Sequence, residues 1–145
     1  MGDTKALANR LVRRFGTRDP EKIIKSLDYI LIEAPLTGVR GCYQYLHRCH
    51  IIYVHNGLNE VDRRWVCAHE LGHSLLHKGL NRVFMDACTV MPTGRYEQEA
   101  DRFAADLLFD DAELIALTEY PIETVAKCLG VSYDIAAYRM RSLKA

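Results

Sequence analysis

The middle of the chain carries two histidines and one glutamate within an otherwise uncharged stretch. Between residues 65 and 76 the only Asp, Glu, Lys or Arg is Glu70, inside the pattern His-Glu-Leu-Gly-His at residues 69–73. Helical residues four apart lie on one face, one turn apart, so a helix brings the two imidazoles together. The pattern therefore predicts a buried helix, from about Asn59 to His77, that presents a pair of histidines on one side.

Two imidazoles one helical turn apart can share a metal ion. Zinc accepts histidine nitrogen at about 2.0–2.1 Å, and a catalytic zinc site combines three protein ligands with a water. His69 and His73 are the expected ligands, whereas Glu70 points away from the same ion and can reach the water as a general base. The alternative is a core helix with hydrogen-bonded histidines, and it offers no reason for a glutamate in register with them.

A third ligand has to come from another segment. One common pattern places a histidine six residues after the second one, but Gly79 stands at that position. The segment from Tyr96 to Leu108 predicts a second, amphipathic helix. The first turns of this helix offer two carboxylates, Glu97 and Glu99.

Spacing favours one of these two carboxylates. Glu97 and Asp101 lie one turn apart, so Glu97 can bind the ion while Asp101 accepts a hydrogen bond from a ligand histidine and fixes its tautomer. Glu99 points about 200° away from Glu97, and we expect it on a solvated helix face. The preferred third ligand is therefore Glu97, with Glu99 as the alternative.

The rest of the chain predicts short helices on either side of a small sheet. The expected helices cover residues 4–15, 20–27, 110–117, 121–130 and 132–143, and the expected strands cover residues 29–32, 42–46 and 50–55. Helices, a small sheet and then helices are typical of an α+β fold. We expect one domain over residues 1–145. Within it, residues 121–145 form a helical segment whose sequence pattern is similar to that of a helix-turn-helix.

Composition limits the class of protein and its partners. The chain has 145 residues, of which 49% are hydrophobic and 26% charged, which is typical of a globular domain with its own core. Its 19 basic and 19 acidic side chains cancel, which argues against nucleic acid or an anionic membrane as the main partner. Because the chain shows neither an apolar run that could span a membrane nor a secretory signal, we expect a cytoplasmic protein with reduced thiols.

Several other residues have ordinary structural interpretations. We expect His77 at the end of the histidine-bearing helix, too far from His69 to bind the same ion, and Gly79 as the left-handed cap. Cys67 is expected to be a buried small apolar side chain. The cluster Cys42, His47, Cys49 and His50 indicates a hairpin loop rather than a second metal site. A developing oxyanion needs a hydrogen-bond donor, and the sequence does not decide among four tyrosines: Tyr43, Tyr45, Tyr53 and Tyr96.

Together the two central helices resemble those of a known family. His69-Glu-Leu-Gly-His73, followed by Glu97-Gln-Glu-Ala-Asp-Arg-Phe-Ala-Ala-Asp-Leu-Leu108, is similar to the ImmA/IrrE family of metallo-endopeptidases. The resemblance extends over roughly residues 25–143 and includes the segments 51–54 and 125–132. The family's usual proline after the Leu-Leu pair is replaced here by Phe109-Asp110-Asp111.

The resemblance implies a fold, a metal site and a substrate. The fold is zincin-like, with a small antiparallel or mixed sheet packed on the active-site helix and a helical C-terminal part. One Zn²⁺ per chain is held by His69, His73 and Glu97, and Glu70 is the catalytic acid/base. Family members are cytosolic, often encoded on phages and mobile elements, and are implied to cut a helix-turn-helix transcriptional repressor. We expect the substrate to pair as an added strand along residues 51–55.

Two other functions stay open at this point. The first is a metal-binding regulatory partner of a repressor that does not cut it. The intact Glu70 argues against this function, because a pure binder needs no general base. The second is a DNA-binding module with a structural zinc, to which Arg139, Arg141 and Lys144 could contribute. Two short helices that pack onto the domain are the favoured interpretation of that basic segment.

Overall fold

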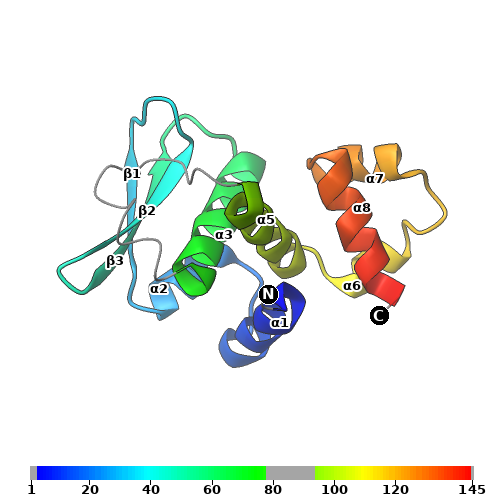
Figure 1. Ribbon diagram of the computed structural model, residues 1–145, viewed down its shortest axis with the longest axis horizontal. Helices are drawn as coiled ribbons and strands as arrows, with labels where there is room; N and C mark the ends of the chain where they lie inside the picture. The colour runs from blue at the N-terminus through cyan, green and yellow to red at the C-terminus, as the bar shows by residue number, and fades with distance from the viewer. Residues whose placement is uncertain (1–2, 78–93, 145) are drawn as a thin grey trace.

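A computed structural model describes residues 3–77 and 94–144 of the chain. In Figure 1, α3 (Glu60–Leu76) runs between a small sheet and α5 (Gly94–Leu108), and α1 (Thr4–Phe15) lies next to α5. The predicted α+β fold, with a sheet packed on the histidine-bearing helix, is confirmed. None of the described helices is both long enough and apolar enough to cross a membrane.

Both N-terminal helices begin at an aspartate. The side chains of Asp3 and Asp19 accept backbone N–H groups in the first turns of α1 and of α2 (Pro20–Ser26), which satisfies donors that a helix start leaves unpaired. α1 ends at Gly16, which has a φ of 68°, a conformation that costs glycine little. These two helices and their ends agree with the prediction.

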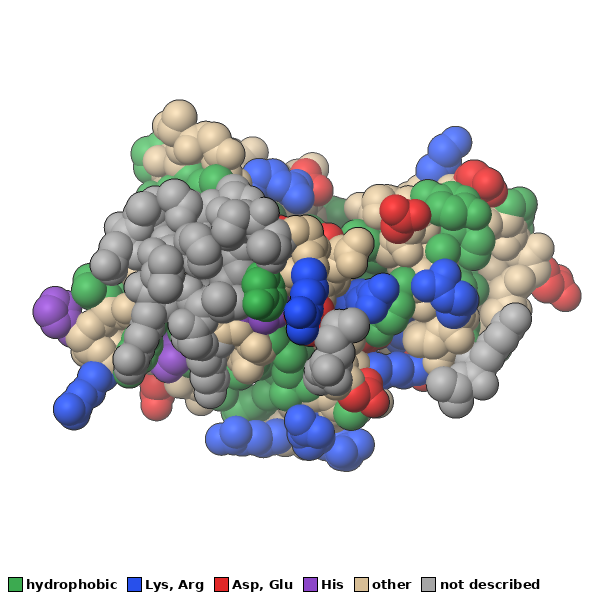
Figure 2. All heavy atoms as spheres, viewed as in Figure 1, with side chains coloured by type: hydrophobic (Ala, Val, Ile, Leu, Met, Phe, Trp, Pro, Cys, Tyr) green, Lys and Arg blue, Asp and Glu red, His purple; other side chains and the backbone are tan. Residues whose placement is uncertain are grey.

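The solvent-facing side of α1 is basic. Arg10, Arg13 and Arg14 are exposed, and Figure 2 shows Lys and Arg side chains gathered along the lower edge of the view, where α1 lies. The opposite side of the helix buries Ala8 and Leu11. This division between an apolar and a charged side explains why α1 packs against α5 with its basic side in solvent.

Three strands form a mixed sheet in the order β1-β3-β2. β1 (Ile30–Ala34) runs parallel to β3 (Cys49–His55), and β2 (Gly41–Leu46) runs antiparallel to β3. A turn at His47 and Arg48 joins β2 to β3, with φ values of 51° and 64°, as a type I′ hairpin requires. The three predicted strands and the hairpin loop are therefore confirmed, with strand ends shifted by one or two residues.

The strand order shows that one prediction was wrong. Residues 51–55 belong to β3, which lies between β1 and β2, so both of its edges are already paired and cannot receive a substrate strand. A strand pattern identifies which residues pair in a sheet but not which strand lies in the centre, because pairing partners are distant in sequence. Within the described residues, the edges of the sheet belong to β1 and β2.

The crossing of α3 and α5 depends on a glycine. α3 begins after Asn59, whose side chain accepts the Asp62 N–H. Farther along, a Cβ atom on Gly72 would lie 3.0 Å from Cδ2 of Phe103 and 3.4 Å from Cα of Ala100. The missing side chain therefore lets the two helices approach closely, with Phe103 fully buried in the shared core. The expected cap at Gly79 lies outside the described residues.

The C-terminal part consists of short helices, as predicted. They are α6 (Asp111–Ile115), α7 (Ile122–Leu129), α8 (Tyr133–Arg141) and the 3₁₀ helix η2 (Ser142–Lys144). Asp110 caps α6, and its side chain accepts the Ala112 N–H. α7 packs on α8 around a small apolar cluster, and α8 contacts α5. The C-terminal helices are thus connected to the rest of the molecule through α5.

A buried arginine makes that connection. Arg139 is 1% exposed, and its guanidinium donates to the backbone carbonyls of Ala105 at 3.3 Å and Phe109 at 2.6 Å. It also donates to Asp111 and to Ser142. Arg139 therefore packs the C-terminal helices onto the end of α5, in agreement with the favoured interpretation of this segment rather than with DNA contact.

We predict that Gly41→Ala destabilises the protein by about 1–3 kcal/mol, the usual cost of overpacking. A Cβ atom on Gly41 would overlap Cγ1 of Val66 and lie 3.0 Å from the carbonyl oxygen of Tyr53. Urea denaturation measures the change. Gly94→Ala is the matched control because a Cβ there meets no atom of the described residues within 4 Å, so equal stability of the two variants would contradict the prediction.

We also predict that Arg139→Lys lowers the free energy of unfolding by about 2–3 kcal/mol, because one ammonium group cannot replace a guanidinium that serves several buried acceptors. Thermal and urea denaturation measure this loss. The exposed Arg141 is the control, and Arg141→Lys should change stability by less than about 0.5 kcal/mol. A stable Arg139→Lys variant would show that the charge alone, and not the carbonyl contacts, connects α8 to α5.

Candidate metal centre

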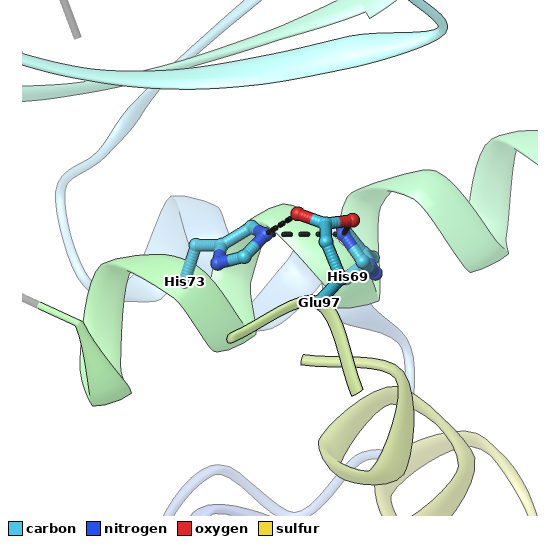
Figure 3. Close-up of side chains that lie close together, drawn as sticks. All are labelled: His69, His73 and Glu97. Atoms are coloured by element: carbon cyan, nitrogen blue, oxygen red, sulfur yellow. Dashed lines mark hydrogen bonds and ion pairs between the residues drawn. The ribbon is translucent and has the colours of Figure 1, made fainter. Parts of the chain in front are cut away.

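Two helices bring three metal-binding side chains to one point. His69 and His73 lie one turn apart on α3, with their Nε2 atoms 3.1 Å from each other. Glu97, in the first turn of α5, places Oε2 at 3.1 Å from Nε2 of His69 and Oε1 at 2.9 Å from Nε2 of His73. Figure 3 shows the carboxylate of Glu97 reaching across from α5 to both rings. The structure therefore brings together the three residues that the sequence singled out as ligands.

The spacing of these donor atoms suits a small tetrahedral ion. Ligands at about 2.0–2.1 Å from a tetrahedral zinc lie roughly 3.3–3.4 Å from one another, close to the separations of 2.9–3.1 Å found here. Two imidazole nitrogens and a carboxylate are also a donor set that zinc accepts. Within residues 3–77 and 94–144, no other group of three His, Cys, Asp or Glu side chains comes as close together.

The three side chains differ in exposure. That of Glu97 is 33% exposed, whereas those of His69 and His73 are 12% and 6% exposed. Among the residues that the structure describes, three side chains make up the group that could hold an ion. Three protein ligands are typical of a catalytic zinc site, whereas four surround the ion in a structural one.

Asp101 is hydrogen-bonded to Nδ1 of His69, the ring nitrogen that faces away from the centre. Its Oδ1 atom lies 2.8 Å from Nδ1 of His69, which leaves Nε2 directed at the centre. Burial opposes the charged form of His69, but the hydrogen bonds to Asp101 and Glu97 outweigh it and raise the pKa of His69 to about 10. Burial likewise opposes ionisation of Glu97, yet its bonds to both imidazoles hold the pKa of Glu97 well below its ordinary value. The Glu97 carboxylate is therefore ionised, as a metal ligand must be.

His73 has a different partner, which the sequence analysis did not identify. Nδ1 of His73 lies 2.9 Å from Nδ1 of His77, and Nε2 of His77 lies 3.3 Å from Oε1 of Glu99. His77 does occupy the C-cap position of α3, but its side chain is buried, and burial together with His73 lowers the pKa of His77.

The expectation for Glu99 was wrong. Glu99 is only 8% exposed and does not lie on a solvated face. It stands one turn before Phe103, which is fully buried on the same side of α5. That spacing is the signal that could have placed Glu99 inside the molecule.

Glu70 lies beside the centre, on the side of the sheet. The residue is 8% exposed, and burial raises the pKa of its carboxyl group, although His69 and His73 oppose this effect. No hydrogen bond joins its carboxylate to another residue in the described ranges. A Cβ atom on Gly41 of β2 would lie 3.4 Å from Cγ of Glu70, so the start of β2 passes directly over this side chain.

Other residues near the centre have structural contacts. Cys67 is fully buried, as predicted, and burial raises its pKa to about 12. The hydroxyl of Tyr53 donates to Gln44 at 2.8 Å, and that of Tyr43 pairs with His50. These two hydroxyls are thus hydrogen-bonded to other side chains.

Comparison with known proteins agrees with this geometry. Residues 25–141 match the model of peptidase family M78, described as the IrrE N-terminal-like domain. Uncharacterized immunity region protein 2 of Bacillus phage phi105 is 33% identical over 135 residues, which is 91% of this chain and 85% of that protein. Metallopeptidase ImmA of Bacillus subtilis (strain 168) is 27% identical over 137 residues, which is 92% of this chain and 81% of that protein. The chain therefore belongs to the ImmA/IrrE family of metallopeptidases.

Proposed function

We propose that the chain is a zinc-dependent endopeptidase in which His69, His73 and Glu97 hold one Zn²⁺ and Glu70 is the general base. The observation that carries this proposal is the convergence of two Nε2 atoms and one carboxylate from different helices, with separations of 2.9–3.1 Å. A bound zinc supplies Lewis-acid chemistry, which polarises a substrate carbonyl and lowers the pKa of a water to about 7.

The protein's own residues account for the proton transfers. Glu70 takes the proton from the attacking water and passes it to the nitrogen of the leaving amine. A buried carboxyl group with a raised pKa suits this role, because it can hold the proton between the two steps. The position of Glu70 next to the proposed ligands and under β2 supports this role for a substrate that binds on the sheet side.

The edge of β2 is the site where we propose that the substrate strand binds. The His55 N–H donates to the Arg40 carbonyl at 2.8 Å. Because hydrogen-bonded pairs alternate in an antiparallel ladder, Gly41 and Tyr43 direct their backbone groups away from β3. A peptide paired with these groups would run past Glu70 as an added strand. This proposal replaces residues 51–55, which lie inside the sheet.

The proposed substrate is a helix-turn-helix transcriptional repressor. Support comes from the relatives, one of which is called an immunity region protein and the other metallopeptidase ImmA. A repressor substrate places the action of the chain in the cytoplasm. We further propose that residues 1–145 act as one metallopeptidase domain, because the contacts of Arg139 connect the C-terminal helices to α5.

We predict that Glu70→Gln binds Zn²⁺ as the wild type does but cuts at a rate about 10²–10⁴-fold lower, since it lacks a general base. The assay mixes the Zn²⁺-loaded protein with a purified helix-turn-helix repressor and detects fragments by mass spectrometry. A chelator and His69→Ala should both abolish cleavage. Relief of repression by Glu70→Gln, with the repressor intact, would instead support the alternative of a regulatory partner without proteolysis.

We also propose that Asp101 orients His69, and predict that Asp101→Ala weakens Zn²⁺ binding about 10–100-fold. The reason is that Nδ1 of His69 loses the acceptor that directs Nε2 at the ion. Competition with a chromophoric chelator measures the affinity. Glu119→Gln, at an exposed acid after α6, is the control and should bind Zn²⁺ normally. Wild-type affinity in Asp101→Ala would mean that packing alone orients His69.

A further inference from the structure

Two buried residues outside the proposed ligand set, a histidine and a glutamate, are linked to His73 by consecutive hydrogen bonds. His77 and Glu99 are 4% and 8% exposed. Nε2 of His77 lies 3.3 Å from Oε1 of Glu99, and Nδ1 of His77 lies 2.9 Å from Nδ1 of His73. Both side chains would be expensive to bury without partners, and the partners they have lead directly to a proposed ligand.

The chemistry of the three groups sets the direction of the hydrogen bonds. Oε1 of Glu99 is an acceptor, so Nε2 of His77 donates the hydrogen bond between them. A neutral imidazole has one donor and one acceptor nitrogen, so Nδ1 of His77 is left as an acceptor. With an ion bound at the centre, Nδ1 of His73 would then donate to Nδ1 of His77, which would leave the lone pair of His73 on Nε2. That nitrogen faces His69 and Glu97.

Ring packing holds this arrangement in place. The rings of His73 and His77 have centroids 5.1 Å apart, and the ring of Tyr96 packs edge-on against His77 with a centroid distance of 4.9 Å. His77 is therefore fixed between His73, Glu99 and Tyr96. A ring enclosed in this way has little freedom to flip and present the other nitrogen.

We propose that His77 and Glu99 are positioning residues for the metal centre, which hold His73 in the tautomer and orientation that direct its Nε2 lone pair at the ion. This inference rests on the proposed function, because it requires His73 to be a ligand. The two histidine ligands are then oriented by different means, His69 by the carboxylate of Asp101 and His73 by an imidazole backed by the carboxylate of Glu99. All three carboxylates, those of Glu97, Glu99 and Asp101, come from α5.

The direct test is the protonation pattern of the histidine rings. Long-range ¹H–¹⁵N NMR of the full chain loaded with Zn²⁺ should show His77 protonated on Nε2 and bare on Nδ1, and His73 protonated on Nδ1. A His77 ring protonated on Nδ1 would overturn the proposal, because it could not accept from His73. Failure of the wild type to bind Zn²⁺ would instead overturn the proposed function and this inference with it.

Variants test the same point through the metal itself. We expect His77→Leu to bind Zn²⁺ and Co²⁺ about 10–100-fold more weakly and to alter the visible absorption bands of bound Co²⁺. His77→Asn, which restores an acceptor, should recover part of the affinity. A folded His77→Leu protein with the affinity and Co²⁺ spectrum of the wild type would overturn the proposal.

Glu99→Gln provides a second test if His77→Leu does not fold. It preserves the volume of the side chain but allows the amide to donate to His77, so it no longer dictates which nitrogen carries the proton. We expect weaker Co²⁺ binding and a mixture of His77 tautomers, with the melting temperature of the metal-free protein close to that of the wild type. An unchanged tautomer and unchanged Co²⁺ affinity in Glu99→Gln would overturn the role of Glu99.

Discussion

The close crossing of α3 and α5 is the constraint on which the metal centre depends. The imidazoles of His69 and His73 come from α3 and the carboxylate of Glu97 comes from α5, so neither helix alone provides the site. Gly72 lets the two helices meet, since a Cβ atom there would press on Phe103. Because interiors are packed as densely as organic crystals, the apolar core around this contact sets the distance between the donors as well as the stability of the fold.

The same crossing explains how α5 can carry three acids into a largely buried region. An unpaired buried carboxylate is costly, and here each one lies against an imidazole of α3 or of His77, which follows it. Glu97 meets the Nε2 atoms of two rings, Asp101 meets the outer nitrogen of His69, and Glu99 meets His77. The hydrogen bonds that stabilise these carboxylates also orient the ring nitrogens. The same contacts therefore stabilise the buried acids and direct the histidines of the site.

We propose that the sheet contributes an edge for the substrate rather than a ligand. β3 is enclosed by its neighbours, and the hairpin turn at His47 and Arg48 returns the chain so that β2 becomes an outer strand. Gly41, at the start of β2, lies over Glu70 and has no side chain to separate the strand from the helix. Glu70, the proposed general base, therefore lies between the proposed metal ligands and strand β2.

Sequence alone determined the features that depend on neighbouring residues. The helix starts at Asp3, Asp19 and Asn59, the pairing of His69 with His73 on one face, and the match of Glu97 with Asp101 all follow from the period of the helix and from local capping. The four-residue spacings of Glu99 to Phe103 and of His73 to His77 are local patterns as well. Only the tertiary structure decided which strand lies in the centre of the sheet and that His77 meets Glu99. These outcomes depend on which segments pack together, and burial and pairing between residues far apart in the chain have no local pattern that records them.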